Sequence, residues 1–245
     1  METLEFDLPS ALLTQLVELL DSMPSESLAQ GKLKEVPEEQ GVYQLFLDEN
    51  LVYIGKTDAE AGLKKRLSRH CEKIKNRAGL QPGIVKFKAV RIYVFTAMDL
   101  ETQLIDHYKS TLGKLEWQNS GFGSNDPGRK RDSGKPGVFD STFPIDIDLP
   151  FDAQLEPGTF SVSDALNSLK RIVPYVVRFE RVKKGQAPHT DLSAASITIH
   201  KGIDTPRKLL EEVKIALSAD WQITALPGYV IIYKESNKYT SGQVL

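Results

Sequence analysis

Two short apolar runs separated by a polar turn constrain the fold of this chain more than any other feature. The runs are GVYQLFL, residues 41–47, and LVYIGKT, residues 51–57, and both are rich in β-branched and aromatic residues. The polar residues DEN at 48–50 lie between them and suit a tight hairpin turn. The sequence therefore predicts two adjacent antiparallel strands, each with one tyrosine, Tyr43 and Tyr53.

Hydrophobic periodicity predicts the elements that flank this hairpin. Apolar residues at helical spacing indicate helices, and runs of β-branched and aromatic residues indicate strands. The expected elements, in chain order, are a helix over 4–23, the hairpin, a basic helix over 62–77, a strand over 88–96 and a helix over 99–112. The order β-β-α-β-α after the first helix predicts an α+β fold in which helices flank a small three-stranded sheet.

The remaining residues predict a long loop and then a second α+β unit. The stretch from residue 117 to 141 is rich in Gly, Pro, Asn and Ser, which favour loops. The later elements are expected to be a helix over 161–171, strands over 174–182 and 195–200, a helix over 205–218 and two strands around residues 227–228. We therefore expect an N-terminal helical extension (1–35), a central domain with the loop (36–156) and a small α+β C-terminal domain (157–245).

Charge is distributed unevenly along the chain. Residues 1–50 contain eleven acids and two bases, whereas residues 56–91 contain eleven bases and three acids. A basic segment of this density attracts phosphate and is typical of a nucleic-acid-binding protein. A solvated helix face gives the same pattern and remains an alternative. The expected DNA contacts in this segment are Lys56, Lys65 and Arg69.

The cysteine content and the hydropathy pattern limit the environment of the protein. The single cysteine, Cys71, excludes a disulfide framework and a cysteine-based zinc site. The N-terminal residues METLEFDLPS do not resemble a secretory signal, and no stretch reaches the roughly 18 apolar residues that a membrane span needs. We therefore expect a soluble, cytoplasmic protein without a membrane partner.

Two of the predicted helices place charged or polar groups on their apolar faces. Arg66 and His70, one turn apart, share the packed side of the basic helix, and Glu101 lies on the apolar stripe near the start of the helix over 99–112. Such groups need partners when they are buried, so Arg66 and His70 suit a phosphate or carboxylate, and Glu101 suits a single Mg²⁺ or Mn²⁺ ion. An arginine that extends to solvent, a satisfied core histidine and a helix-capping acid are the alternatives.

The order of these motifs resembles the GIY-YIG nuclease superfamily. The matching pieces are GVY, then YIGKT ten residues later, Arg66 and His70 on the next helix, Glu101 at the start of a further helix, and WQN at 117–119. The tract NSGFGSNDPGRKR, residues 119–131, resembles the Eco29kI-type restriction endonucleases within that superfamily. The resemblance covers roughly residues 36–143.

The resemblance implies a role for each matching residue in the hydrolysis of a DNA phosphodiester. Tyr43 would activate the attacking water and Tyr53 would be its hydrogen-bonding partner at the phosphate. A phenol is a poor base at neutral pH, so Tyr43 needs nearby cations. Arg66 would hold the non-bridging oxygens, His70 would contact Tyr43 or the phosphate, and Glu101 would bind one Mg²⁺ or Mn²⁺ ion.

Further residues follow from the same resemblance. Asn119 matches the asparagine that steadies the family's site, and Asn125 is the alternative. Gly55 is expected to keep the backbone open to the DNA. The basic triplet Arg129, Lys130 and Arg131 is expected to bind DNA, with its arginines as guanine readers.

The sequence as a whole therefore predicts a hydrolase that cuts DNA. The resemblance implies a metal-dependent, site-specific endonuclease of the type II restriction class with a role in host defence, and an accompanying DNA methyltransferase. Double-stranded DNA would be the substrate, and a homodimer would suit palindromic sites. The C-terminal domain would contact DNA or form a dimer. A repair or recombination GIY-YIG nuclease and a non-catalytic DNA-binding or assembly module are the alternatives.

Overall fold

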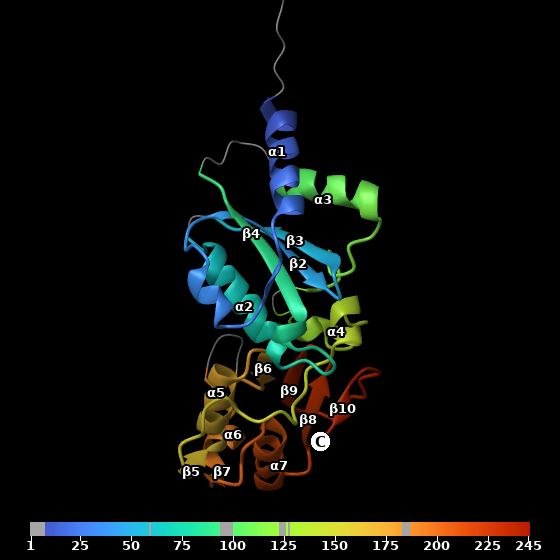
Figure 1. Cartoon of the computed structure of the whole chain (residues 1–245). Coiled ribbons are helices and arrows are strands. Elements are labelled where there is room, and N and C mark those ends of the chain that lie inside the picture. The colour runs from blue at the N-terminus through green and yellow to red at the C-terminus, as the bar shows by residue number, and fades with distance from the viewer. Residues whose placement is uncertain (1–7, 59, 94–99, 123–125, 127, 183–186) are drawn as a thin grey trace, which may run out of the picture. The chain divides into compact units, whose positions relative to one another are not determined.

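The chain forms two compact units, each with its own sheet and hydrophobic core (Figure 1). The computed structural model describes residues 8–58, 60–93, 100–122, 126, 128–182 and 187–245. Unit 1 comprises residues 1–75 and 81–120, and unit 2 comprises residues 76–80 and 121–245. Residues 121–156, which the sequence groups with the central domain, thus belong to unit 2.

Unit 1 has the order of elements that the sequence predicts. Its elements are α1 (Leu8–Ser22), β1 (Glu26–Ser27), the 3-10 helix η1 (Lys32–Glu35), β2 (Gly41–Leu47), β3 (Asn50–Lys56), α2 (Leu63–Lys75), the 3-10 helix η2 (Pro82–Ile84), β4 (Val85–Arg91) and α3 (Leu100–Leu112). The predicted β-β-α-β-α order is confirmed. The parts of the predicted helices and strand that fall on residues 4–7 and 94–99 lie outside the described residues.

The sheet of unit 1 has four strands in the order β1-β4-β2-β3 and is antiparallel throughout. The sequence predicts three strands, and the sheet contains a fourth. The additional strand, β1, is only two residues long and pairs Glu26 with Phe87 and Ser27 with Lys86. A two-residue strand shows no hydrophobic alternation, so the sequence pattern could not reveal it.

The turn between β2 and β3 has two residues, Asp48 and Glu49, and Leu47 pairs with Asn50. Both turn residues have positive φ, 49° and 63°. This combination is that of a type I′ turn, whose twist matches that of the flanking strands. The short turn sets the first pairs, Leu47 with Asn50 and Phe46 with Leu51. A bulge then shifts the register by one residue, so that Leu45 pairs with Tyr53 and Val52 is the extra residue of β3. The turn and the bulge together fix the face on which each side chain of the hairpin lies.

Helices cover both faces of this sheet (Figure 1). Helices α1 and α3 pack on the face that carries Val42 and Ile54, where Leu16, Leu20 and Leu104 complete the core. Helix α2 covers the opposite face and buries its apolar stripe, including Leu63, Leu67, His70, Cys71 and Ile74. The predicted inward face of the basic helix is thus confirmed.

Unit 2 is a separate α+β structure. Its elements are the 3-10 helix η3 (Arg129–Arg131), α4 (Val138–Thr142), β5 (Gly158–Ser161), α5 (Val162–Ile172), β6 (Val176–Phe179), α6 (Thr190–Ala194), β7 (Ser196–Ile199), α7 (Pro206–Ala216), β8 (Trp221–Leu226), β9 (Tyr229–Lys234) and β10 (Gln243–Val244). The sheet order is β10-β8-β9-β6, with β6 parallel to β9, and β5 pairs with β7. The core lies between this sheet and the apolar faces of α5 and α7.

A five-residue segment between α2 and β4 belongs to unit 2. The side chain of Arg77 in this segment is 3 % exposed. Its Nη1 donates to Asp140 Oδ1 at 2.7 Å and to the carbonyls of Phe143 and Pro227 at 2.9 and 3.2 Å. Arg77 therefore anchors the segment 76–80 within unit 2, although the sequence counts it among the phosphate-attracting bases.

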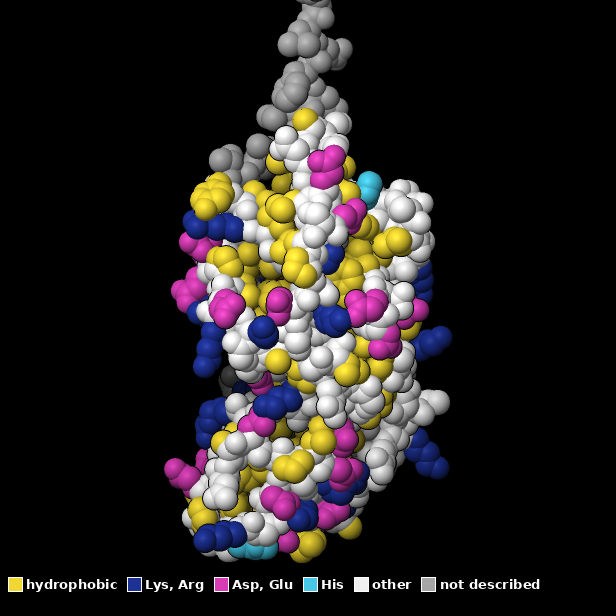
Figure 2. Space-filling view, viewed as in Figure 1, with side chains coloured by type: hydrophobic (Ala, Val, Ile, Leu, Met, Phe, Trp, Pro, Cys, Tyr) yellow, Lys and Arg dark blue, Asp and Glu magenta, His cyan; other side chains and the backbone are white. Residues whose placement is uncertain are grey.

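Several other bases of residues 56–91 also have acidic partners. Lys64 pairs with Glu38 at 3.2 Å, and Arg91 pairs with Glu39 at 3.0 Å. Lys and Arg side chains lie among Asp and Glu side chains on the face that Figure 2 shows. The positive charge of residues 56–91 is therefore partly neutralised by acids from other parts of unit 1, such as Glu38 and Glu39. Among the described residues, no helix is both long and apolar enough to cross a membrane.

We predict that an Arg77→Met variant lowers the free energy of unfolding of unit 2 by about 3 kcal/mol. The substitution leaves the carboxylate of Asp140 and two carbonyls without their buried donor. The fluorescence of Trp221, 1 % exposed in unit 2, can follow unfolding by urea in a Trp117→Phe background. The exposed Lys201→Met serves as the control and should shift the midpoint little, and equal midpoints for the two variants would contradict the anchoring role.

Candidate active site

The register of the hairpin brings the two tyrosines to one face of the sheet. Tyr43 lies opposite Gly55, and Leu45 lies opposite Tyr53. Because residues two apart on a strand share a face, Tyr43 and Tyr53 are diagonal neighbours on the face that α2 covers. Their ring centroids are 6.2 Å apart.

The ring of Tyr43 occupies the space that a side chain at residue 55 would need, so only glycine fits there. A Cβ atom at residue 55 would lie 2.4 Å from the Tyr43 hydroxyl oxygen and 2.5 Å from its Cζ. The expectation that this space stays open for DNA is therefore wrong, since a side chain of the protein itself fills it. The glycine allows the phenol of Tyr43 to cross strand β3.

Helix α2 supplies two partners for the Tyr43 hydroxyl. His70 Nε2 lies 2.8 Å from the Tyr43 hydroxyl oxygen, and Arg66 Nε donates to the same oxygen at 3.3 Å. The His70 ring also packs against Tyr53, with centroids 5.8 Å apart. Since the hydroxyl oxygen already accepts from Arg66, its own hydrogen is available for an unprotonated Nε2 of His70. The structure thus joins Tyr43, Tyr53, Arg66 and His70, as the sequence predicts.

Burial keeps both Tyr43 and His70 uncharged at neutral pH. It raises the pKa of Tyr43 well above its usual value, and the nearby Tyr53 adds to the rise while Arg66 opposes it. Burial also lowers the pKa of His70 to about 3, and the positive charges of Arg66, Lys73 and Arg69 add to the decrease. The resting pair is therefore a neutral phenol hydrogen-bonded to a neutral imidazole.

Glu101 lies in the first turn of α3, where an acid also interacts favourably with the helix dipole. Its Oε2 is 3.9 Å from Lys56 Nζ, and its carboxylate is close enough to Tyr43 to raise the pKa of that phenol further. The side chain of Glu101 is 25 % exposed, so its oxygens remain accessible. The hydroxyl group and the carboxylate therefore lie at one end of the sheet, where β2 begins and β3 ends.

These residues fit a single hard cation. Among the residues that the structure describes, no three His, Cys, Asp or Glu side chains are grouped as metal ligands. Mg²⁺ is commonly held by only one or two carboxylates and takes its remaining oxygens from water and phosphate. One accessible carboxylate, that of Glu101, near the Tyr43 hydroxyl matches that set of donors.

Comparison with known families decides what this arrangement is. Residues 39–115 match the family model of the GIY-YIG catalytic domain. Residues 39–115 therefore form a GIY-YIG catalytic domain. No match was found among curated proteins. The matched residues include Tyr43, Tyr53, Arg66, His70 and Glu101 and form a nuclease domain, a hydrolase with DNA as its substrate.

The segment that follows the GIY-YIG match is fixed to the edge strand β3. The amide of Trp117 donates to the carbonyl of Val52 at 2.9 Å, and the amide of Ile54 donates to Gln118 Oε1 at 3.1 Å. Asn119 comes next, is exposed and has a φ of 60°. No sequence pattern singles out Gln118, whose side chain joins this segment to the strand that carries Tyr53. Asn125 lies outside the described residues.

The predicted DNA-binding residues differ in their surroundings. Lys65 and Arg69 are exposed on α2, and Lys56 is close to Glu101. In unit 2, Arg129 forms ion pairs with Glu180 and Glu235, whereas Lys130 and Arg131 are exposed.

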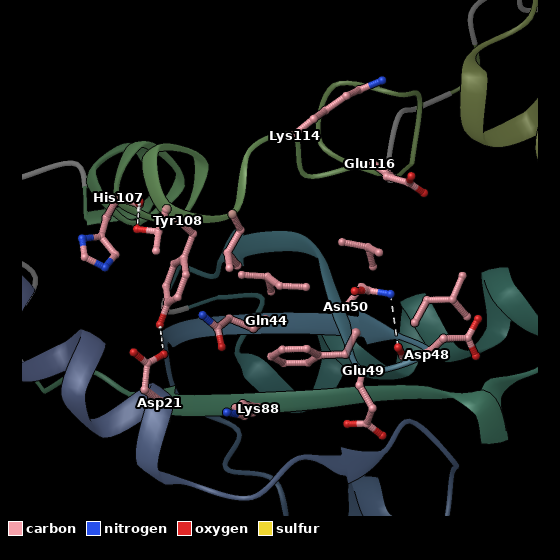
Figure 3. A pocket seen from close by; sticks show the side chains of 16 residues that line it. Asp21, Gln44, Asp48, Glu49, Asn50, Lys88, His107, Tyr108, Lys114 and Glu116 are labelled. Carbon is pink, nitrogen blue, oxygen red and sulfur yellow. Dashed lines mark hydrogen bonds between the residues drawn. The ribbon is translucent and has the colours of Figure 1, made fainter.

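A cavity of about 560 Å³ lies on the opposite face of the GIY-YIG sheet from the tyrosines (Figure 3). Gln44 and Lys88 line it from the sheet, and His107 and Tyr108 line it from α3. The buried Nε2 of Gln44 has no hydrogen-bond partner among the described residues. Because alternate residues of β2 face opposite sides, this cavity is separate from the active site.

We predict that Gly55→Ala reduces DNA cleavage at least 100-fold, because the added methyl group displaces the Tyr43 ring and separates its hydroxyl from His70. Gly83→Ala is the matched control, since a Cβ there meets no atom within 4 Å. Initial rates on a plasmid substrate would measure the effect, with circular dichroism to confirm folding. Unchanged activity in a folded Gly55→Ala variant would show that the ring position does not matter.

We also predict that the buried neutral His70 makes the protein less stable in mild acid. Between pH 7 and pH 5 the unfolded chain takes up a proton at His70, whereas the folded protein does not do so until its pKa of about 3 is approached. The free energy of unfolding should therefore fall by about 2 kcal/mol over this range. Urea titrations at both pH values should show that His70→Asn removes this decrease and that His107→Asn retains it.

Proposed function

We propose that the protein is a metal-dependent DNA endonuclease that cuts double-stranded DNA at a specific site, as type II restriction enzymes do. The main support is the hydrogen-bonded group of Tyr43, His70 and Arg66, with the accessible carboxylate of Glu101 near the Tyr43 hydroxyl. A DNA-binding module without activity has no need for this group. The glycine-rich tract at 119–131 supports the restriction class over a repair or recombination nuclease.

Tyr43 and His70 would act together as the base. A phenol with a raised pKa does not ionise readily, so Tyr43 alone is a weak base. If its oxygen accepts a proton from the attacking water while its own proton passes to His70 Nε2, no free phenolate forms. The 2.8 Å contact between the two groups suits this transfer. The negative charge of the incoming phosphate would favour the protonated form of His70.

Arg66 would orient the phosphate. Its Nε is bonded to the Tyr43 hydroxyl, and its guanidinium also interacts with the side chain of Tyr53. A guanidinium can bind two oxygens at once, which would fix the phosphorus atom relative to the attacking water. Tyr53, adjacent to both Tyr43 and His70, would contact the same phosphate.

Glu101 would hold the divalent ion, Mg²⁺ or Mn²⁺. A bound ion would stabilise negative charge on the phosphate and on the leaving oxygen. Lys56, 3.9 Å from Glu101, would offset the charge of the carboxylate before the ion binds and contribute to phosphate binding. Lys65 and Arg69 would contact the DNA backbone beside the site, and Asn119 would steady it.

The remaining parts of the proposal concern the organisation of the protein in the cell. Residues 1–35 would form a helical extension of the nuclease domain of unit 1. Residues 157–245, in unit 2, would contact DNA or form a homodimer suited to palindromic sites. Restriction activity would require a DNA methyltransferase to protect the host genome, and the protein would act in the cytoplasm in host defence.

We predict that the wild type with Mg²⁺ cuts unmethylated phage DNA into discrete bands and that Glu101→Gln reduces cleavage at least 1000-fold, because the amide is a far weaker ligand for a hard cation. Glu18→Gln, which changes an exposed acid of α1, is the matched control and should remain active. Gel electrophoresis over time gives the rates.

Two results would contradict the proposal, and each would favour a different alternative. DNA binding without cleavage by the wild type would indicate the non-catalytic module. Cleavage that depends on the structure of the DNA and not on its sequence would indicate a repair or recombination nuclease.

A further inference from the structure

The basic triplet at 129–131 forms a short turn in unit 2 that is held at both ends. It is the 3-10 helix η3, and Gly128, with a φ of 80°, leads into it. At its first residue, Arg129 Nη1 bonds Glu180 Oε1 at 2.7 Å and Nη2 lies 3.5 Å from Glu235 Oε2. The same guanidinium lies 4.1 Å from the centre of the Tyr233 ring. These contacts occupy Arg129 within unit 2.

Asp132 holds the other end of the turn. Its side chain is 2 % exposed and accepts hydrogen bonds from Tyr229 at 2.9 Å and from both terminal nitrogens of Arg178. Arg178 also pairs with Asp126 at 3.2 Å, before the turn begins. The acids on both sides of the basic triplet are therefore neutralised inside unit 2.

This arrangement leaves three cations uncompensated. The side chains of Lys130, Arg131 and Lys135 are exposed and form no hydrogen bond or ion pair with the residues that the structure describes. Two of them are adjacent and the third is four residues further on, so a short segment displays three positive charges. In unit 1, by contrast, Lys64 and Arg91 each have an acid beside them.

We propose that Lys130, Arg131 and Lys135 form a contact surface for the phosphate backbone of DNA, and that Arg129 anchors this surface and does not read bases. The inference rests on the proposed function, because it takes the substrate to be DNA. The contacts of Arg129 and Asp132 hold the backbone of the turn, and each phosphate that the three cations neutralise releases counterions. An acidic protein partner would suit these charges as well, and the test below separates the two.

The salt dependence of binding measures how many phosphates the surface contacts. Fluorescence anisotropy of a labelled duplex gives the binding constant at several salt concentrations. Divalent ions are omitted so that the DNA is not cleaved during the measurement. Replacing Lys130, Arg131 and Lys135 with glutamine should reduce the slope of log Kobs against log [salt] by about 2 to 3 and weaken binding about 10- to 100-fold at 200 mM salt. Lys114, Lys201 and Lys238 are also exposed, so their replacement with glutamine gives a control with the same change in net charge.

The outcomes are distinct. A control variant with the wild-type slope and a test variant with a reduced slope would support the surface. Equal slopes for the wild type and the test variant, or equal losses in the test and control variants, would overturn it while leaving the proposed function intact. A wild type that neither binds nor cuts duplex DNA would overturn the proposed function and this surface together.

Discussion

The geometry of the active site depends on the contact between the ring of Tyr43 and the main chain of Gly55. Because the ring crosses strand β3 at the glycine, its hydroxyl lies 2.8 Å from His70 and within reach of Arg66. The register that allows this contact is set by the two-residue turn together with the bulge at Val52. A shift of one residue would turn Tyr43 toward α1 and α3 and away from both partners. The tyrosine of the GVY tripeptide and the glycine of the YIG tripeptide thus form a single packing contact.

The site combines two residues whose environments move their pKa values in opposite directions. Burial disfavours the phenolate of Tyr43 and the imidazolium of His70, and a hydrogen bond joins the two neutral groups. Such a pair can pass a proton without either residue becoming a free ion in the resting state. Arg66, held by Tyr43, brings the positive charge that a phosphate needs to the same place.

Much of unit 1 could be predicted from the sequence because its signals are local. Strand alternation located β2 and β3, and helical spacing identified the buried face of α2. The shared face of the tyrosines depends also on the bulge at Val52, which the sequence pattern did not reveal. The neighbours of Gly55, Arg77 and Arg129 could not be predicted. Arg77 finds Asp140 63 residues away and Pro227 150 residues away, and Arg129 finds Glu180 51 residues away. A count of charges cannot distinguish such anchored arginines from those that face solvent.

The segment 76–80 makes the chain leave unit 1, enter unit 2 and return before unit 1 is complete. Arg77, two residues beyond the helix that carries Arg66 and His70, takes its partners from Asp140, Phe143 and Pro227. The last of these is synthesised 150 residues after Arg77. A chain that ended before Asp140 would retain Tyr43, Tyr53, Arg66, His70 and Glu101 and yet leave the charged side chain of Arg77 without its buried partners. The candidate site residues are thus present in the growing chain before the segment 76–80 can complete its contacts.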